Sequence, residues 1–316
     1  MYRDFFRLRD EPFRLTPDPR FLHLSEPHQN ALRVLLEGII YRKGLLMITG
    51  LVGTGKTTLI HAALEVLADA SKQKMPIKSA LLFNPTLTRE EFFEGLIDEF
   101  EVACSSTSKP GRLSALHGML LNMQKRGGTS VLFIDEAHLL PFELLEEIRL
   151  LGNVDSHQEK LLQIVLCGQP ELVGILSRKE AWALQQRIAG RAQLRSLAQP
   201  ETRAYIAERL HAAGLEGPSP FAGQSVEFIQ RFSQGVPRLI NLVCDGCLML
   251  GFRTQRRTIQ PDMVEEVALS LGLSHPTLFL ERESPPVPIP SVGQAQKSAV
   301  DVLIEGMRVS RAAARE

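Results

Sequence analysis

The stretch GLVGTGKT, residues 50–57, lies between a short apolar run and a segment with helical spacing of its apolar residues. The apolar run, LLMIT (45–49), has the length and composition of a buried strand. A glycine-rich turn between such a strand and a helix fits the pattern G-x-x-x-x-G-K-[ST], in which backbone N–H groups turn inward and bind phosphate oxygens. The stretch therefore predicts a phosphate-binding loop at the end of a buried strand.

The residues of this loop have different expected roles. Lys56 should reach the β- and γ-phosphates of a nucleotide, and the hydroxyl of Thr57 should bind Mg²⁺. A chance glycine-rich turn would not need a strand before it and a helix after it. The remaining nucleotide contacts are expected from Gly50, Leu51, Val52, Gly53, Thr54, Gly55 and Thr58.

A pair of acidic residues ends another buried strand. In SVLFID (130–135) the apolar run stops at Asp135, and Glu136 follows directly. Asp135 is placed to hold Mg²⁺ through its water shell, and Glu136 to polarise the attacking water. The alternative, in which the two acids only cap the next helix, does not explain why they terminate a buried strand in a chain with a phosphate-binding loop.

Strands and helices alternate through the first two thirds of the chain. The first four expected strands are apolar throughout, which indicates a parallel sheet with helices on both faces. From about residue 199 only helical patterns follow, each bounded by Pro or Gly. The expected strands are 45–49, 79–83, 130–135, 161–168 and 191–195. The expected parts are an N-terminal segment 1–24, an α/β base 25–197, a helical lid 198–272, a proline-rich linker 273–297 and an amphipathic helix over 298–316.

The spacing of the motifs narrows the class of nucleotide-binding protein. One expected strand, 79–83, separates the loop from Asp135, and a further strand is expected to insert beside it. An inserted strand together with Glu136 is typical of the hydrolytic P-loop NTPases, which include AAA+ proteins and RecA-like motors. The chain has no N-K-x-D guanine-reading motif, which favours ATP over GTP. The letters DEAH (135–138) also occur in helicases, but those proteins need a second parallel sheet, and from about residue 199 only helical patterns follow.

Two further polar residues are candidates for the chemistry. Gln169 ends the fourth strand, where its side chain could touch the γ-phosphate or the attacking water, although a turn residue explains it equally well. Arg187 ends a helix just before the fifth strand, a position that suits an arginine finger offered to a neighbouring subunit. A solvated surface charge is the commoner state of any single arginine.

The stretch QGVPRLINLVCDGC (234–247) allows two interpretations. Cys244 and Cys247 have the C-x-x-C spacing of a metal or redox site. A helix that starts at Pro237 would place both cysteines two turns inside it, on the face that packs against the rest of the lid, so we expect buried thiols. Arg238 lies on the first turn of that helix and can point at the nucleotide.

The composition of the whole chain sets limits on partners and location. It has 36 basic and 36 acidic residues, so its net charge does not favour nucleic acid or anionic lipid as a partner. Its first residues, MYRDFFRLRDEPF, carry Arg and Asp where an export signal needs an apolar run. No apolar run approaches the ~20 residues that cross a bilayer. We expect a cytoplasmic protein without a transmembrane segment, attached to the inner membrane only through a partner.

Six stretches, taken in order, resemble the ExeA-like AAA+ ATPases, the general secretion pathway protein A family with TniB-related ATPases beside it. The resemblance implies an ATPase base with a helical lid, ATP and Mg²⁺ as cofactors, and a homo-oligomeric ring or filament. It implies that Arg238 is the sensor 2 arginine of the lid. The stretches are residues 1–25, GLVGTGKTTL (50–59), 131–155, KLLQIVLCGQPEL (160–172), QQRI (185–188) and GVPRLINLVCD (235–245).

The same resemblance suggests which machines such an ATPase serves. Its relatives accompany secretion, exosortase or polysaccharide-export and pilus-type systems, so a protein of such a machine is the expected partner. Secretion-pathway members continue into a transmembrane helix and a periplasmic region, and we expect neither in these 316 residues. The alternative is a TniB-like adaptor for transposition that binds DNA in an ATP-dependent way; nucleic acid is therefore retained as a partner but is not favoured.

Overall fold

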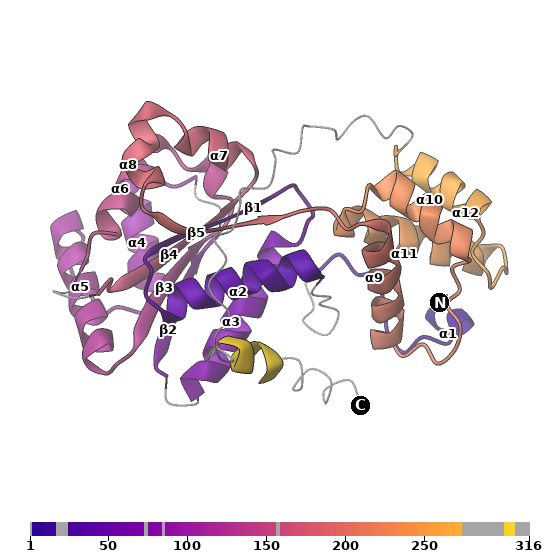
Figure 1. Ribbon diagram of the computed structural model, residues 1–316, viewed down its shortest axis with the longest axis horizontal. Coiled ribbons are helices and arrows are strands. Elements are labelled where there is room, and N and C mark those ends of the chain that lie inside the picture. Colours follow the sequence, from indigo (N-terminus) through magenta and orange to yellow (C-terminus); the bar gives the residue numbers. More distant parts are fainter. Residues whose placement is uncertain are drawn as a thin grey trace.

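The computed structural model of this chain describes residues 2–16, 25–72, 75–83, 86–155, 159–273 and 300–306. Two lobes are visible in Figure 1, an α/β base and a helical lid to its right in that view. The predicted linker, apart from residue 273, lies outside the described residues, as does the predicted C-terminal helix beyond residue 306.

The base contains one five-stranded sheet whose strands are all parallel. The strand order is β2-β3-β4-β1-β5, so β4 lies between the strand that carries the phosphate-binding loop and the strand that carries Asp135. The expected inserted strand is therefore present, and the predicted α/β fold with five parallel strands is confirmed. The strands are β1 (Leu45–Gly50), β2 (Ile77–Leu82), β3 (Thr129–Ile134), β4 (Leu162–Gly168) and β5 (Ile188–Leu194).

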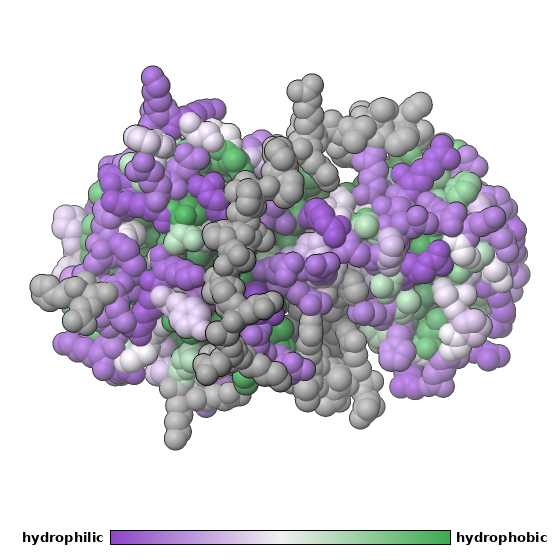
Figure 2. All heavy atoms as spheres, viewed as in Figure 1, coloured by the Kyte–Doolittle hydropathy of each residue, from purple (hydrophilic) through white to green (hydrophobic). Residues whose placement is uncertain are grey.

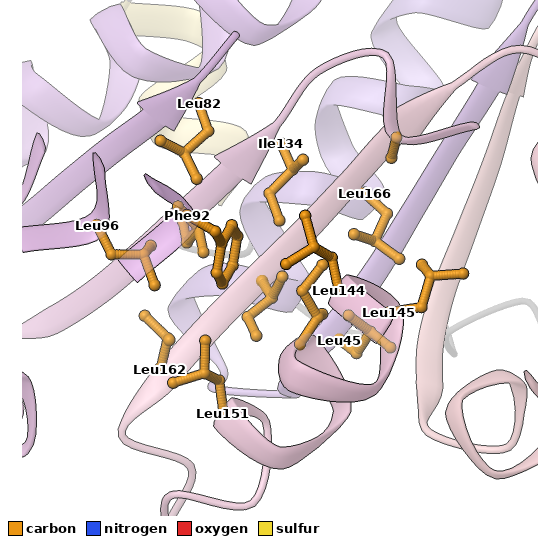
Figure 3. Close-up of a cluster of buried hydrophobic side chains, with 14 of the residues drawn as sticks. Leu45, Leu82, Phe92, Leu96, Ile134, Leu144, Leu145, Leu151, Leu162 and Leu166 are labelled. Carbon is orange, nitrogen blue, oxygen red and sulfur yellow. The ribbon is translucent and has the colours of Figure 1, made fainter. Parts of the chain in front are cut away.

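Helices cover both faces of this sheet. Alternate residues of one strand point to opposite faces, so that in β3 Leu132 and Ile134 join one hydrophobic cluster while Val131 and Phe133 join the other. The first cluster packs under α4 (Arg89–Glu99), α5 (Lys109–Lys125) and α6 (Phe142–Leu151), and part of it is drawn in Figure 3. The second packs under α2 (Glu26–Ile40) and α3 (Lys56–Lys72). Short helices complete the base: η2 (Ala137–Leu139), α7 (Glu171–Leu176), η3 (Lys179–Ala181) and α8 (Trp182–Gln185).

The lid has its own hydrophobic core. Cys244 and Cys247 lie fully buried in that core as free thiols, as the sequence indicated. No group of three or more potential metal ligands occurs anywhere in the described part of the chain. The lid helices are α9 (Gln199–Ala212), α10 (Gly223–Ser233), α11 (Pro237–Arg253) and α12 (Pro261–Ser270).

The N-terminal segment packs on the lid although it precedes the base in sequence. Its helix α1 (Tyr2–Phe6) contacts α11, and Tyr2 and Phe6 are buried in the lid core. The Tyr2 hydroxyl donates to Asp245 Oδ1 on α11 at 2.6 Å. In Figure 1 the N-terminus accordingly lies beside the lid helices.

Residues 300–306 are helical and lie against α2 and α3, as the yellow helix in Figure 1 shows. Val300 and Ile304 are buried in the same cluster as the α2 and α3 side chains, and Asp301 pairs with Arg33 of α2. This part of the predicted C-terminal helix is therefore packed on the base. The face of the molecule in Figure 2 is mainly hydrophilic, and within the described residues no helix has both the length and the apolar character needed to cross a bilayer.

Candidate active site

The loop between β1 and α3 has the backbone conformation that its glycines permit. Gly53 and Gly55 have φ angles of +79° and +98°, which residues with a Cβ rarely adopt. Both glycines also lie against other groups: a Cβ on Gly53 would come within 2.8 Å of Arg238 Cβ, and one on Gly55 within 3.0 Å of His28 Nε2. The loop therefore needs glycine for its own turns and for close contact with its neighbours.

Lys56 lies buried inside this loop. Its Nζ donates to the carbonyl oxygens of Gly50 at 2.8 Å and Leu51 at 3.1 Å. Two carbonyl oxygens thus hold the ammonium group at the loop, where a phosphate oxygen would be a stronger, charged acceptor.

Thr57 and Asp135 meet at the edge of the sheet. The Thr57 hydroxyl, on the first turn of α3, donates to Asp135 Oδ2 at 2.7 Å, and Asp135 is buried. Asp135 Oδ1 accepts from the backbone N–H of Glu136 at 2.9 Å. A hydroxyl and a carboxylate are oxygen ligands of the kind that Mg²⁺ binds, so these two residues fit the predicted metal site.

Glu136 follows β3 with an unusual backbone. Its φ is +51°, in the left-handed region that costs a residue with a Cβ of order 1–3 kcal/mol. Its side chain lines a cavity, and its Oε2 is buried without a hydrogen bond from any described residue. His138 Nδ1 lies 3.4 Å from Oε2. A carboxylate in this state can accept a proton from a water molecule in the cavity.

Cys167 lies on β4 behind these charged groups. Burial raises the pKa of its thiol, the negative charge of Asp135 raises it further, and Lys56 opposes the shift. The thiol is therefore neutral near pH 7 and is not a nucleophile.

A cavity of about 340 Å³ brings the base and the lid together. Its walls include residues 52–58 of the loop and Glu136, so seven of the nine predicted nucleotide-contact positions in the loop face it, whereas Gly50 and Leu51 are not part of its lining. The lid contributes Tyr205, Arg209, Pro237, Arg238 and Asn241, and the N-terminal segment contributes Arg14, Leu15 and Thr16.

Arg238 lies where the sequence placed it, on the first turn of α11. Its backbone N–H donates to the Gly53 carbonyl at 3.2 Å, so the lid helix begins directly on the phosphate-binding loop. The side chain is exposed and lines the cavity. Asn241, one turn further along, accepts from the Tyr205 hydroxyl at 2.9 Å.

Gln169 and Arg187 lie outside the cavity lining. Gln169 Nε2 is 2.9 Å from His138 Nε2, so it reaches Glu136 through a histidine. Arg187 precedes β5, whose first residue pairs with the first residue of β1, so it lies at the opposite end of the strands from the loop. Its guanidinium donates to the Arg149 carbonyl at 3.0 Å and to Asn153 Oδ1. Six strand residues span about 20 Å, so Arg187 cannot reach its own loop.

His28 and Arg209 are site residues that the sequence analysis did not identify. His28 is buried on α2, and its Nε2 lies 2.8 Å from the Thr54 carbonyl while its Nδ1 lies 2.6 Å from Ser25 Oγ. Arg209 on α9 donates to the carbonyls of Pro12 and Arg14 and so holds the N-terminal segment against the cavity. The apolar spacing of α2 was a sequence signal for the helix of His28, whereas the pattern of α9 gave no signal for Arg209.

The comparisons with known proteins agree with this geometry. Residues 39–176, which include the loop, both acids and Gln169, match the AAA domain family. General secretion pathway protein A of Aeromonas hydrophila is 38% identical over 256 residues, which are 80% of this chain and 45% of that protein. The resemblance inferred from the motifs is thus confirmed, and the chain spans less than half the length of this relative.

Solved structures support the AAA+ fold over a longer part of the chain. The ORC2 protein of Aeropyrum pernix, in complexes with ADPNP and ADP, has a TM-score of 0.59 and 16% identity, covering 82% of this chain and 71% of that one. A Drosophila ORC structure bound to DNA has a TM-score of 0.61 and 16% identity, covering 86% of this chain and 66% of that one. At this identity the similarity extends to the fold alone.

Proposed function

We propose that this protein is a Mg²⁺-dependent ATPase. The observation that carries the proposal is the single cavity shared by the loop around Lys56, by Glu136 beside the bonded pair Thr57 and Asp135, and by Arg238 of the lid. Each of these residues has a distinct task in ATP hydrolysis, and all of them come to one place from separate elements.

The tasks follow from the positions. Lys56 exchanges its loop carbonyls for the β- and γ-phosphates of ATP. Glu136 accepts a proton from the attacking water as its oxygen bonds to the γ-phosphorus and the bridging oxygen leaves with ADP. Arg238 contacts the phosphates from the lid, and the residues of the N-terminal segment cover the nucleoside. Thr57 and Asp135 would hold Mg²⁺, which neutralises phosphate charge when bound.

Substitution of Glu136 tests the proposal. Glu136→Gln removes the proton acceptor but keeps the shape of the side chain, so we expect ATP to bind with nearly wild-type affinity while kcat falls by at least about 100-fold. Lys56→Ala should abolish ATP binding. Binding is measured with a fluorescent ATP analogue and turnover by phosphate release. Normal turnover by Glu136→Gln would refute the assignment.

We also propose that Arg187 acts on the ATP of a neighbouring copy in a ring or filament. Its place at the far end of β5 supports action in trans rather than in cis. Arg187→Ala should bind ATP and lose turnover. Mixing it with Glu136→Gln should restore part of the activity. In mixed oligomers the Arg187→Ala copies supply cavities with an intact Glu136, and the neighbouring Glu136→Gln copies supply an intact Arg187. If Arg187 acts within its own chain, the mixture stays inactive.

The similarity to general secretion pathway protein A supports a role in assembling a secretion, polysaccharide-export or pilus-type machine. We therefore propose a cytoplasmic location, with a protein of that machine at the inner membrane as the partner. A DNA-binding adaptor has less support, because the chain is neutral overall and its likeness to DNA-bound ORC extends to the fold only. Co-purification of a membrane protein with the Glu136→Gln variant in the presence of ATP tests the role.

A further inference from the structure

His138 lies between Glu136, the proposed base, and Gln169, the polar residue that follows β4. Its ring Nε2 is 2.9 Å from Gln169 Nε2, and its Nδ1 is 3.4 Å from Glu136 Oε2. The backbone N–H of Gln169 also points at Nδ1, at 3.4 Å. The imidazole therefore contacts both residues, and its side chain is only 10% exposed.

The fold leaves space for this ring. Gly168 is the last residue of β4, and a Cβ there would come within 3.1 Å of the His138 backbone nitrogen and 3.5 Å of Nδ1. On the other side, the left-handed backbone of Glu136 turns its carboxylate toward the ring, where Oε2 is buried without a hydrogen bond. A buried carboxylate oxygen beside an imidazole responds to which ring nitrogen carries the proton.

A neutral imidazole has one N–H, and both the backbone N–H and the side-chain amide of Gln169 influence which ring nitrogen carries it. When the amide offers its NH₂ group to Nε2, that nitrogen accepts, and the proton on Nδ1 faces Glu136. When the amide offers its oxygen, Nε2 carries the proton, and the lone pair of Nδ1 faces the carboxylate. The backbone N–H of Gln169 donates to Nδ1, which fits the second arrangement, and Glu136 Oε2 accordingly has no hydrogen bond from the ring. The first arrangement would replace that bond by one from Nδ1 to Glu136 and so hold the carboxylate against the ring.

We propose that His138 is a positioning residue that couples the amide of Gln169 to the carboxylate of Glu136. A γ-phosphate that engages the Gln169 NH₂ group keeps the amide oxygen on His138 Nε2, so bound ATP favours the arrangement in which Glu136 is free to act as a base. This inference rests on the proposed ATPase activity, and it adds a coupling residue to the site.

A double-mutant cycle tests the coupling. The variants are His138→Ala, Gln169→Ala and the double variant, with kcat and KM for ATP measured for each. If His138 passes the state of Gln169 to Glu136, each single variant lowers kcat by about 10–100-fold, the ATP Kd changes by less than about threefold, and the double variant is no slower than the slower single one. If the kcat losses of the two single variants multiply in the double variant, the proposal is overturned. His117→Ala, on the exposed face of α5, is the control and should match the wild type.

A second pair of variants separates coupling from packing. His138→Leu fills the space without ring nitrogens, whereas His138→Asn keeps an amide near the position of Nδ1. We expect His138→Leu to be as slow as His138→Ala and His138→Asn to recover part of kcat, with all three keeping the wild-type thermal midpoint within a few degrees. A wild-type kcat for His138→Leu would reduce His138 to a packing residue. If the wild-type protein itself does not hydrolyse ATP, the proposed function fails; if it does and only these results fail, the coupling alone is wrong.

Discussion

His28 illustrates how one buried side chain can shape a nucleotide site from outside the motif that defines it. The Thr54 carbonyl can only accept, so His28 Nε2 carries the proton and Nδ1 accepts from the Ser25 hydroxyl. Thr54 is fully buried with the ring in place. The bond ties the turn of the phosphate-binding loop to the start of α2.

We expect His28→Ala to weaken ATP binding. An unsatisfied buried carbonyl costs about 1–3 kcal/mol, which corresponds to an increase of roughly tenfold in the ATP Kd if the loop relaxes to satisfy it elsewhere. Titration of a fluorescent ATP analogue measures the change, and His117→Ala is again the matched surface control. An unaltered Kd in His28→Ala would show that the loop keeps its shape without this contact.

At the scale of elements, the helix that carries Arg238 is positioned by a tight connection. Gly235 has a φ of +74°, its carbonyl accepts from Leu197 N at 2.8 Å, and Pro237 occupies the first turn of α11. The start of α11 also bonds the loop through Arg238 N. The connection therefore joins the end of the base, the lid helix and the loop within a few residues.

Gly235→Ala should disrupt this junction. A Cβ at residue 235 would lie 2.0 Å from the Leu197 carbonyl oxygen, in addition to the strain of a positive φ. Overpacking and strain of this kind cost about 1–3 kcal/mol each, so we expect the thermal midpoint to fall by about 5 °C or more. Gly223→Ala, at the start of α10 with nothing within 4 Å of the added Cβ, is the matched control. Equal midpoints for the two variants would contradict the packing described here.

At the scale of the whole molecule, two hydrophobic clusters flank the sheet and a third fills the lid, and the N-terminal segment belongs to the third. Cavity walls come from the base, the lid and the N-terminal segment, so the site depends on how the two lobes meet. The N-terminal segment, the base and the lid, which follow one another in the sequence, therefore all contribute residues to the cavity.

The reactivity of the cysteines measures whether these hydrophobic cores are closed. Burial raises the pKa of Cys247 to about 12 and that of Cys244 well above its usual value, and it raises the pKa of Cys167 as well. Because the thiolate is the reactive form, native protein at pH 8 should be alkylated at the half-buried Cys104 far faster than at the other three, while unfolded protein should react at all four. Mass spectrometry measures the pattern. Rapid native labelling of Cys244 would show that the lid core is open.

The sign of these pKa shifts also predicts a pH dependence. The folded state keeps both lid thiols protonated, so their contribution to stability is intact below the unfolded thiol pKa of 9.0 and is lost as the pH rises through the folded values. The lid should therefore unfold more readily in alkaline solution, and Cys244→Ser should respond differently because it removes one of the titrating groups.

The sequence by itself determined the loop, the acidic pair and the class of fold. Residues 50–57 and 130–136 are local patterns whose chemistry depends on a strand that ends and on the few residues that follow, so spacing alone identified them. The uniformly apolar strands likewise predicted a covered parallel sheet, and Pro237 predicted the start of the helix that carries Arg238.

Only the tertiary structure decided which distant residues meet. That His28 bonds the loop, that Arg209 holds the N-terminal segment, and that His138 joins Glu136 to Gln169 depend on strand order and on the packing of lobes. Nothing in local spacing encodes these contacts, because each joins residues from elements far apart in the chain or at the ends of neighbouring strands. The same holds for Arg187, whose distance from its own loop follows from the length of β5 in the sheet. Short stretches of sequence determine which residues form the phosphate-binding loop and the acidic pair, whereas the packing of the buried apolar surfaces determines which distant side chains contact them.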